Sequence, residues 1–162
     1  MKEEIKNIIT DTTKEVLGYL GYSQISNINS YDYNDSFVVA IDSEDKMGLL
    51  IGKNGQNINA LEHLVRVLSY KKASSKGDIQ EPVSFSLDVN NYRKLRSDYV
   101  IKMARETANK VSHTKRSEAL LPMNSYERRL VHTELASFAD IETESVGEEP
   151  RRRIVIKPAI EI

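Results

Sequence analysis

Apolar residues recur first at helical spacing and then at strand spacing, so the first part of the chain predicts a mixture of both elements. Residues 3–20 place their apolar side chains along one stripe of a helix, and Gly21 follows as a C-terminal cap. Residues 24–33 are polar and predict only a short or irregular strand. In residues 36–42 the period changes to two, which predicts a regular strand with one apolar side.

Two helices separated by a tight turn are predicted next. Residues 47–51 form a short apolar run that ends abruptly at the turn Gly-Lys-Asn-Gly, residues 52–55. Apolar residues then return at intervals of three and four in residues 58–68, which predicts a second helix that ends near residues 72–73. After a polar turn, alternating residues predict a strand at 82–89.

From residue 91 onward the pattern predicts a long helix and then a smaller module. The helix spans residues 91–117, and its predicted apolar stripe consists of Tyr92, Leu95, Tyr99, Met103 and Val111. The smaller module contains a strand at 118–122, a helix at 125–138 that opens with a capping box at Asn124, and strands at 141–146 and 153–156. No linker rich in Pro or Gly follows the long helix, so we expect the two halves to be joined rigidly.

Charge is distributed unevenly along the chain, although the formal net charge is only −1. Residues 1–90 carry 9 Lys and Arg against 13 Asp and Glu, whereas residues 91–162 carry 14 against 11. The predicted long helix is the most basic part, since residues 91–116 hold 8 basic and 2 acidic side chains. Local charge governs the attraction of a polyanion more than net charge does, so nucleic acid is a candidate partner.

The composition excludes several classes of function. The 162 residues contain no cysteine, which removes disulfides, thiolate metal ligands and a thiol nucleophile. The three histidines, His63, His113 and His132, lack the spacing of a metal site. No apolar run approaches the roughly 18 residues of a membrane span, and the N-terminus lacks an apolar signal region. We therefore expect a cytoplasmic protein with no metal, no cofactor and no membrane contact.

The Gly52–Gly55 turn is the most informative local motif. Its glycines lack Cβ atoms, so another backbone can approach closely, and the amide groups at the start of the next helix suit a phosphate. Lys53 adds a mobile cation and Asn54 an uncharged donor. For these four residues alone, an ordinary loop between helices is the alternative. A Walker-type nucleotide loop is excluded, because only three residues separate Gly48 from Gly52 and no Ser or Thr follows Lys53.

A second cationic motif lies in the predicted helix at residues 125–138. Arg128 and His132 are four positions apart, so both lie along one edge of its apolar stripe, and Arg129 is adjacent. The last strand gains a cationic end from Arg151, Arg152 and Arg153. On its own, an Arg and a His at this spacing favour a local surface pair over a binding site.

The first module resembles a KH domain, which binds single-stranded nucleic acid and clamps its backbone with a Gly-x-x-Gly loop. A helix and a strand precede its core, as in the prokaryotic form of that domain. The second module resembles the small domain named for its Arg-x-x-x-His signature, which binds single-stranded nucleic acid through that Arg and His. Together the modules are similar to the Jag family of bacterial RNA-binding proteins, also described as SpoIIIJ-associated. Residues 48–56, 121–132 and 143–150 carry this resemblance.

The resemblance implies a non-catalytic, regulatory protein that binds single-stranded RNA, with single-stranded DNA as a second ligand. The implied binding residues are Gly52, Lys53, Asn54, Gly55, Arg128, Arg129, His132, Arg151, Arg152 and Arg153. Unstacked bases are expected in an apolar groove lined by Ile51, Ile58 and the edge of the strand at 36–42. Because aromatic residues make up only 7% of the chain, we expect half-buried tyrosines and no stacking platform. The N-terminal domain and linker of many family members have no counterpart here, so their contacts are not expected.

The expected fold class is α+β. Residues 1–90 would form a prokaryotic-type KH domain, with a three-stranded sheet and helices on one face, and residues 91–162 a long helix followed by a small α/β Arg-x-x-x-His domain. The two modules would share one continuous binding surface. Two alternatives stay open: a protein-interaction module that forms a homodimer or a heterodimer with a small KH protein, and a nuclease. The nuclease would use His132 as general acid or base, but no carboxylate or nucleophile accompanies it at a suitable spacing.

Overall fold

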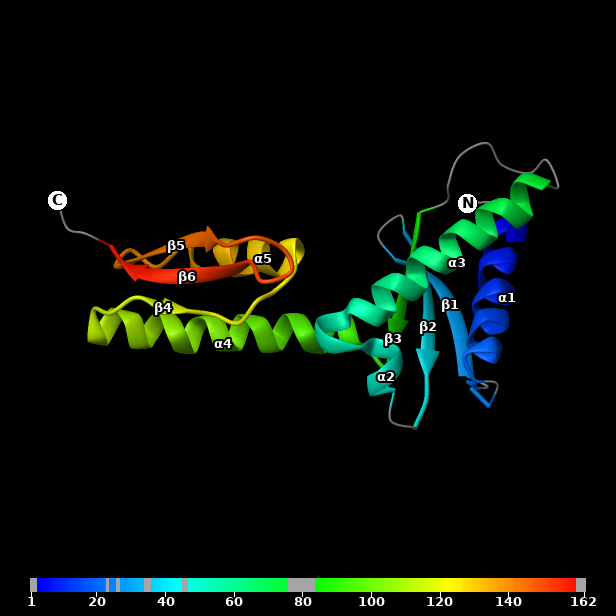
Figure 1. Ribbon diagram of the computed structural model, residues 1–162, viewed down its shortest axis with the longest axis horizontal. Helices are drawn as coiled ribbons and strands as arrows, with labels where there is room; N and C mark the ends of the chain where they lie inside the picture. Colours follow the sequence, from blue (N-terminus) through cyan, green and yellow to red (C-terminus); the bar gives the residue numbers. More distant parts are fainter. Residues whose placement is uncertain are drawn as a thin grey trace. The chain divides into compact units, whose positions relative to one another are not determined.

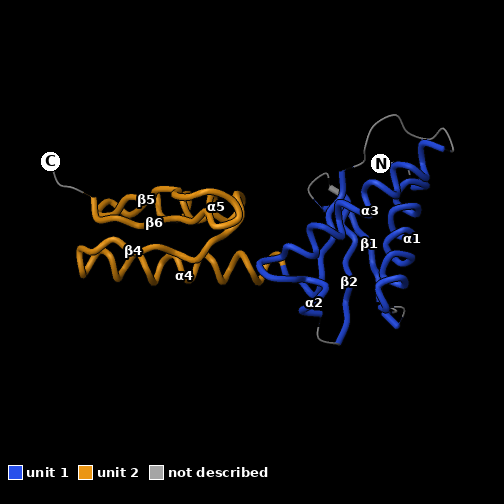
Figure 2. The backbone as a smooth tube through the Cα atoms, in the orientation of Figure 1, with its two compact units in different colours: residues 1–92 blue, residues 93–162 orange. Residues whose placement is uncertain are grey.

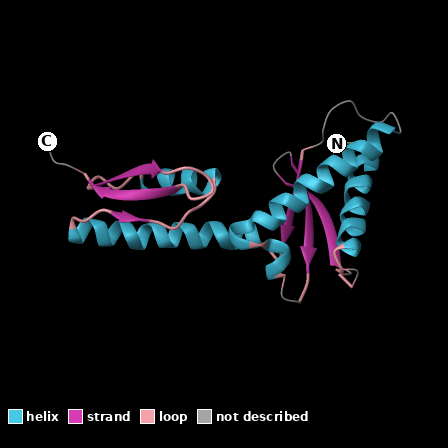
Figure 3. Cartoon of the chain, viewed as in Figure 1, coloured by secondary structure: helices cyan, strands magenta, loops and turns pink. Residues whose placement is uncertain are grey.

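The chain forms two compact units, residues 1–92 and residues 93–162 (Figure 2). The computed structural model describes residues 3–22, 24–25, 27–33, 36–44, 47–75 and 84–159. Each unit has its own three-stranded sheet and its own cluster of buried apolar side chains. The mixture of helices and strands makes this an α+β protein, as predicted (Figure 3).

Unit 1 is built on a sheet with the strand order β1-β2-β3 (Figure 1). Strands β1 (Asn27–Tyr33) and β2 (Ser36–Asp42) are antiparallel, and β3 (Phe85–Val89) runs parallel to β2. The register pairs Phe37 with Phe85, so the large apolar side chains of both strands lie on the same face. That face forms the core of the unit.

Helices cover this apolar face of the sheet. They are α1 (Glu3–Tyr19), the short α2 (Gly48–Ile51), the 3-10 turn η1 (Lys53–Gly55) and α3 (Gln56–Ser75). Helices α1 and α3 pack against each other, and their buried residues Ile9, Leu17 and Val65 join those of the strands in one core. The predicted three-stranded sheet with helices on one face is therefore confirmed for unit 1.

Helix ends in unit 1 agree closely with the sequence prediction. The amide of Tyr22 donates to the carbonyl of Leu17 at 2.8 Å, and Gly21 has a φ of +86°, which confirms the predicted glycine cap of α1. Helix α3 ends at Ser75, slightly later than predicted. The rest of the predicted turn after this helix, residues 76–78, and the first residues of the predicted strand, 82–83, lie outside the described residues.

Two predictions about the strands of unit 1 are wrong. Residues 27–33 form a regular strand that pairs with β2 along its whole length. Most of its side chains are exposed, because β1 is an edge strand, so no apolar alternation marks it in the sequence. The strand β2 is the middle strand, so residues 36–42 have no free edge that could line a groove.

Unit 2 packs two helices against a second sheet. Its elements are α4 (Tyr92–Thr114, which begins at the last residue of unit 1), β4 (Glu118–Ala119), α5 (Ser125–Leu135), β5 (Ile141–Val146) and β6 (Arg153–Pro158). The strand order is β4-β6-β5, with both pairs antiparallel. Residues Ile154 and Ile156 of β6 are buried together with side chains of both helices. Helices α4 and α5 each end three residues earlier than predicted, and β4 is shorter.

The predicted apolar stripe of α4 is wrong at two of its five members. Leu95 is 62% exposed and Tyr99 is 52% exposed. The buried residues of the helix are instead Val100, Ala104, Ala108 and Val111, which also recur at intervals of four and three. The prediction gave weight to large side chains, whereas small alanines allow this helix to approach its core closely.

The predicted capping box of α5 is confirmed and also connects the two helices of unit 2. The side chain of Asn124 accepts a hydrogen bond from the amide of Glu127 at 2.9 Å, and the amide of Asn124 donates to Glu127 at 3.1 Å. The Glu127 side chain is only 4% exposed, and Arg96 of α4 donates to its Oε1 at 2.8 Å. These hydrogen bonds compensate the cost of burying the carboxylate.

The long helices carry charged side chains along their length. Helices α3 and α4 both exceed the length of a membrane span, but neither is apolar enough for one. Within the described parts of the chain, no helix has both the length and the apolar character needed to cross a bilayer.

Candidate nucleic-acid interface

The Gly52–Gly55 turn joins α2 to α3 through backbone conformations that favour glycine. Gly52 has a φ of +73° and Gly55 of +77°, and Asn54 between them has a φ of +53°. Asparagine tolerates this left-handed region better than most residues. The amide of Gly55 donates to the carbonyl of Gly52 at 3.2 Å, which closes the turn. The turn therefore has a compact and specific backbone geometry.

The two glycines are also required by packing within the chain itself. A Cβ atom at Gly52 would lie 2.5 Å from Cγ of Asn57, and one at Gly55 would lie 2.9 Å from Cε1 of Tyr92. The Asn57 amide donates to the carbonyl of Leu49 at 2.7 Å. The missing Cβ atoms predict the close approach of another backbone, but the side chains of Asn57 and Tyr92 occupy the space where those Cβ atoms would lie. No local pattern relates Tyr92 to the turn, because only the fold brings it there.

The outer side of the turn faces solvent. Lys53 is exposed and Asn54 is half-buried. Of the two residues predicted to line a groove beside the turn, Ile51 is half-buried, whereas Ile58 is only 1% exposed. Assigning Ile58 to an open groove was wrong, because the apolar stripe of α3 that contains it faces the sheet.

The outer edge of β3 is occupied by two side chains of α3. Glu62 accepts a hydrogen bond from the amide of Leu87 at 3.1 Å, and Arg66 donates to the carbonyl of Phe85 at 2.9 Å. Glu62 and Arg66 also pair with each other at 2.9 Å. The Arg66 guanidinium lies 5.4 Å from the centroid of the Phe85 ring. The Leu87 amide and the Phe85 carbonyl of β3 could bind the edge of a base only if Glu62 and Arg66 moved away.

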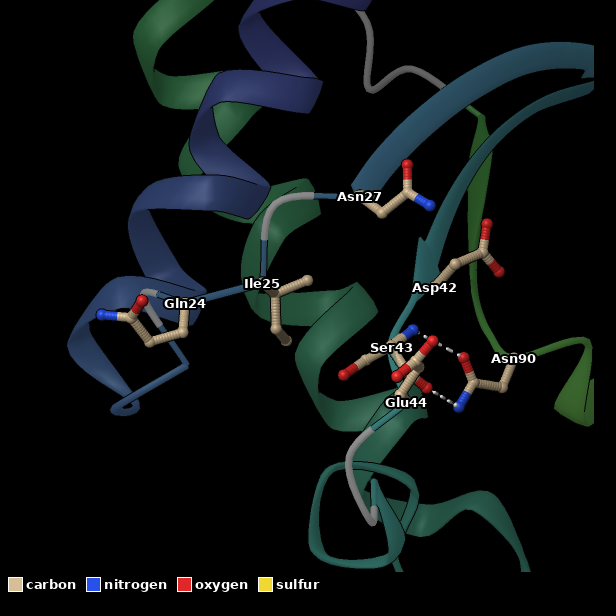
Figure 4. A pocket seen from close by; sticks show the side chains of 7 residues that line it. All are labelled: Gln24, Ile25, Asn27, Asp42, Ser43, Glu44 and Asn90. Carbon is tan, nitrogen blue, oxygen red and sulfur yellow. Dashed lines mark hydrogen bonds between the residues drawn. The ribbon is translucent and has the colours of Figure 1, made fainter.

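A polar pocket of about 470 Å³ lies at one end of the sheet of unit 1 (Figure 4). It is lined by Gln24, Ile25, Asn27, Asp42, Ser43, Glu44 and Asn90. The Asn90 side chain accepts a hydrogen bond from the Ser43 amide and donates one to the Ser43 carbonyl, each at 2.9 Å. The carboxylates of Asp42 and Glu44 make the pocket unfavourable for a phosphate. It therefore lies outside the candidate interface.

The Arg-x-x-x-His segment of α5 lines a hollow of about 360 Å³ in unit 2, called here the α5 hollow. Its lining residues are Arg128, Arg129 and His132 from α5, Thr143 and Ser145 from β5, and Ile154 from β6. The register places Ser145 opposite the buried Ile154, so the two lie on the same face of the sheet. The α5 hollow combines cationic groups and hydroxyl groups with an apolar floor, and this combination suits phosphate and sugar atoms.

Arg128 is the buried member of this group, with 8% of its surface exposed. Its Nη1 donates to the carbonyl of Met123 at 2.8 Å and to Oε1 of Glu149 at 2.7 Å. The carboxylate of Glu149, in the turn between β5 and β6, offsets the positive charge of the guanidinium. No local pattern in the sequence relates Glu149 to Arg128, so this partner was not predicted. Arg128 thus builds the wall of the α5 hollow, whereas Arg129 is exposed.

His132 is exposed and is oriented by β5. Its Nδ1 lies 2.5 Å from the hydroxyl oxygen of Thr143, a residue that sequence analysis did not single out. This contact leaves the opposite ring nitrogen, Nε2, on the side of the imidazole away from Thr143. Among the described residues, no group of three His, Asp or Glu side chains is placed to hold a metal ion.

The three consecutive arginines of the last strand have different surroundings. Arg152 donates from Nε to the hydroxyl of Ser145 at 3.0 Å, which brings it to the rim of the α5 hollow. Arg153 is half-buried and donates from Nε to the carbonyl of Arg151 at 3.3 Å. Arg151 is exposed in the turn before β6. Arg152 is thus hydrogen-bonded to Ser145, which lines the same hollow as Arg128 and His132.

Tyrosine side chains are more exposed than sequence analysis predicted. Five of the eight are large exposed residues: Tyr19, Tyr31, Tyr33, Tyr99 and Tyr126. Tyr126 lies in the first turn of α5 and is 66% exposed. The prediction that the tyrosines are half-buried is wrong for these five, and one of them lies on the helix that carries Arg128 and His132.

Comparison with known proteins matches residues 98–158 to the R-3-H domain, the domain named for its Arg-x-x-x-His signature. Two similar proteins are both named RNA-binding protein KhpB. The one from Clostridium symbiosum is 41% identical over 112 residues, which cover 69% of this chain and 48% of the relative. The one from Bacillus subtilis (strain 168) is 36% identical over 114 residues, which cover 69% of this chain and 52% of the relative.

A more distant protein of the same name, from Streptococcus pneumoniae serotype 2 (strain D39), is 25% identical over 154 residues, which cover 94% of this chain and 45% of the relative. The chain therefore spans about half the length of the curated relatives it matches. Arg128, His132 and the rest of the α5 hollow all fall within the matched residues. We conclude that the chain contains an Arg-x-x-x-His domain, at residues 98–158.

Proposed function

We propose that this chain binds single-stranded RNA and does not cleave it, and that it acts as a regulatory RNA-binding protein. The match to the Arg-x-x-x-His domain and the names of the KhpB relatives support RNA binding. The observation that carries the proposal is the α5 hollow, where Arg129, His132 and two hydroxyl groups surround a space suited to a phosphate.

Within unit 2, a phosphate of the RNA lies between Arg129 and His132 and accepts hydrogen bonds from Thr143 and Ser145. Arg128 supports the wall of the α5 hollow from inside. Arg152 extends the positive charge at the rim, and Arg151 and Arg153 extend it along the turn. Each of these contacts recognises the backbone, so this part of the interface is tolerant of base sequence.

We assign the RNA contact of unit 1 to the outer side of the Gly52–Gly55 turn. The order helix, two antiparallel strands, helix, turn, helix and parallel strand fits a prokaryotic-type KH domain, whose Gly-x-x-Gly loop clamps a nucleic-acid backbone. Lys53 and Asn54 face the ribose-phosphate chain, while Asn57 and Tyr92 hold the turn from inside. The N-terminus of α3 adds a favourable dipole for a phosphate.

Charge reversal in each unit tests this proposal, with matched controls on the same units. Lys53→Glu and Arg129→Glu should each weaken binding of a twelve-nucleotide single-stranded RNA by about tenfold or more at low salt. Lys71→Glu on α3 and Lys102→Glu on α4 change charge equally at exposed sites, and they should have little effect. Fluorescence anisotropy measures the affinity, and a duplex of the same length should bind more weakly than the single strand.

Unchanged affinity in both Lys53→Glu and Arg129→Glu would refute the assigned interface. To test for cleavage, the wild type and the twelve-nucleotide RNA are incubated together for hours and the RNA is run on a denaturing gel. Intact RNA is the expected result, because the imidazole of His132 is in contact with a hydroxyl group rather than a carboxylate. Time-dependent shortening of the RNA that is lost in His132→Ala would instead support the nuclease alternative.

A second candidate function is protein association through an apolar groove of unit 1. The groove has a volume of about 400 Å³ and is lined by Leu20, Tyr22, Leu49, Leu50, Asn57, Ala60, Leu61 and Leu64. Leu49 is 81% exposed and Leu64 is 45% exposed, and the groove brings the two together in one apolar patch of the kind that marks interaction sites. Sedimentation of the wild type and of Leu64→Glu distinguishes the possibilities. A dimer that dissociates in the variant supports association, whereas a monomer at all concentrations rules out a homodimer.

A further inference from the structure

We propose that Tyr126 is a base-stacking residue, which holds a nucleobase next to the phosphate bound in the α5 hollow. This inference rests on the RNA-binding function proposed above and adds a contact to the base itself. Nothing in the Arg-x-x-x-His spacing points to Tyr126, and the low aromatic content of the chain argued against stacking. The position and exposure of this one side chain lead to a different conclusion.

Tyr126 adjoins the binding side chains of α5. Tyr126 and Arg129 are three residues apart and are therefore neighbours on the helix surface, and Arg129 and His132 are neighbours in the same way. With a rise of 1.5 Å per residue, Arg129 lies about 4.5 Å along the axis from Tyr126, and His132 about 9 Å. The ring at one end of this series and the imidazole at the other are thus separated by less than two helical turns.

The ring of Tyr126 is available to a ligand. It is 66% exposed, and in the described part of the chain no cation or aromatic ring packs against it. Tyr99 on α4 provides a contrast, since the guanidinium of Arg96 lies 5.6 Å from its ring centroid and covers one face. An isolated exposed tyrosine needs no explanation, but one placed a turn before a cationic hollow has a specific use.

Stacking supplies what the α5 hollow lacks. The groups that line the hollow are suited to phosphate and ribose, whereas a planar ring offers a surface to a base. One base stacked on an aromatic side chain contributes a factor of about 5 to 150 in affinity and does so with little base preference. The neighbouring Arg129 guanidinium can contact the phosphate of the same nucleotide, so ring and cation together favour an unstacked single strand over a duplex.

A double comparison of protein and RNA tests the inference with the full chain. The two probes are a twelve-nucleotide adenine RNA and a ribose-phosphate chain of equal length without bases. For the wild type, the Kd of the base-free chain divided by the Kd of the adenine RNA reports all base contacts. In Tyr126→Ala and Tyr126→Leu this ratio should fall about fivefold or more, because only the base contact is lost. Tyr126→Phe, which keeps the ring, and Tyr99→Ala, which removes another exposed ring, should retain the wild-type ratio.

Salt dependence provides a second readout that a purely structural role would not reproduce. The slope of log K against log salt should be unchanged in Tyr126→Ala, whereas Arg129→Ala should reduce it by about one. An unchanged Kd ratio in Tyr126→Ala, or an equal fall in Tyr99→Ala, would overturn the inference while leaving RNA binding intact. If the wild type bound neither probe, the proposed function would fail together with it.

Discussion

Arg128 and Glu149 form an ion pair at 2.7 Å inside the Arg-x-x-x-His domain, although 21 residues separate them in the sequence. The Arg128 side chain is 10% exposed and that of Glu149 is 59% exposed, so a partly solvated carboxylate closes over a buried guanidinium. A negative charge thus already occupies a position beside the α5 hollow, where the phosphate of a ligand would approach.

We expect Glu149→Gln to change stability and RNA affinity in opposite directions. Losing a partly exposed ion pair should lower the free energy of unfolding by about 0.5–1 kcal/mol. Affinity for single-stranded RNA at low salt should rise about two- to fivefold, because the charge of Arg128 is no longer offset. Urea unfolding and anisotropy measure the two effects. Weaker binding in the variant would show instead that Glu149 positions Arg128 for the ligand.

Substituting Gly52 with alanine should be far more costly than the same change at Gly48. At Gly52 the new Cβ would lie 2.5 Å from Asn57 and the backbone has a φ of +73°, whereas at Gly48 nothing lies within 4 Å. We expect Gly52→Ala to destabilise the protein by about 1–3 kcal/mol and to weaken RNA binding. Gly48→Ala, inside α2, should be neutral or stabilising by up to about 1 kcal/mol. Equal melting temperatures for the two variants would contradict the packing described for the turn.

Two neighbouring threonines of α1 should respond differently to replacement by valine. Both are fully buried, but the Thr13 hydroxyl donates to the carbonyl of Ile9 at 2.8 Å, whereas the Thr12 hydroxyl has no partner in the described structure. Thr12→Val removes a buried hydroxyl that makes no hydrogen bond and should stabilise the protein by about 0.5–2 kcal/mol. Thr13→Val should not stabilise it. Denaturant midpoints measure both, and a destabilised Thr12→Val would imply a partner for that hydroxyl.

The pH dependence of stability should include a contribution from Asp140. The hydroxyl of Ser112 donates a hydrogen bond to its carboxylate and holds the pKa of Asp140 below its ordinary value of 3.8. A carboxyl whose pKa is lowered in the folded state stabilises the fold at pH values above its pKa in the unfolded state. This stabilisation is lost as the pH falls through the pKa of the folded state. Ser112→Ala should therefore raise the pKa of Asp140, as followed by carboxyl NMR shifts. The stability deficit of this variant should shrink below pH 3.8. A pKa unchanged by the substitution would show that another group lowers it.

The elements of this fold were largely predictable, because strong local patterns define them. The alternating residues of β2 and the capping box at Asn124 both gave correct elements. Burial along α4 was not predictable in the same way. Ala104 and Ala108 face the core there, while Leu95 is exposed, so the fit between elements decided the buried face. The regularity of strand β1 was also underestimated, because edge strands need not alternate in polarity.

The candidate site was predictable where its residues are close in sequence. The Gly52–Gly55 turn is a local motif, and so are Arg128 and His132 on one helix. Their partners come from distant segments: Tyr92 packs against the turn, and Thr143 contacts the imidazole. No spacing rule relates such pairs, since a tertiary contact depends on how the elements assemble. The same holds for Ile58, whose core position follows from the way α3 faces the sheet.

Photo-crosslinking of the full chain to a 4-thiouridine-labelled single-stranded RNA, followed by mass spectrometry of the peptides, tests the central claim most directly. Our account predicts crosslinks in two places, at or beside the Gly52–Gly55 turn and around the α5 hollow between Tyr126 and Ser145, with both lost when unlabelled RNA competes. Crosslinks confined to other surfaces, such as the exposed strand β1, would contradict it.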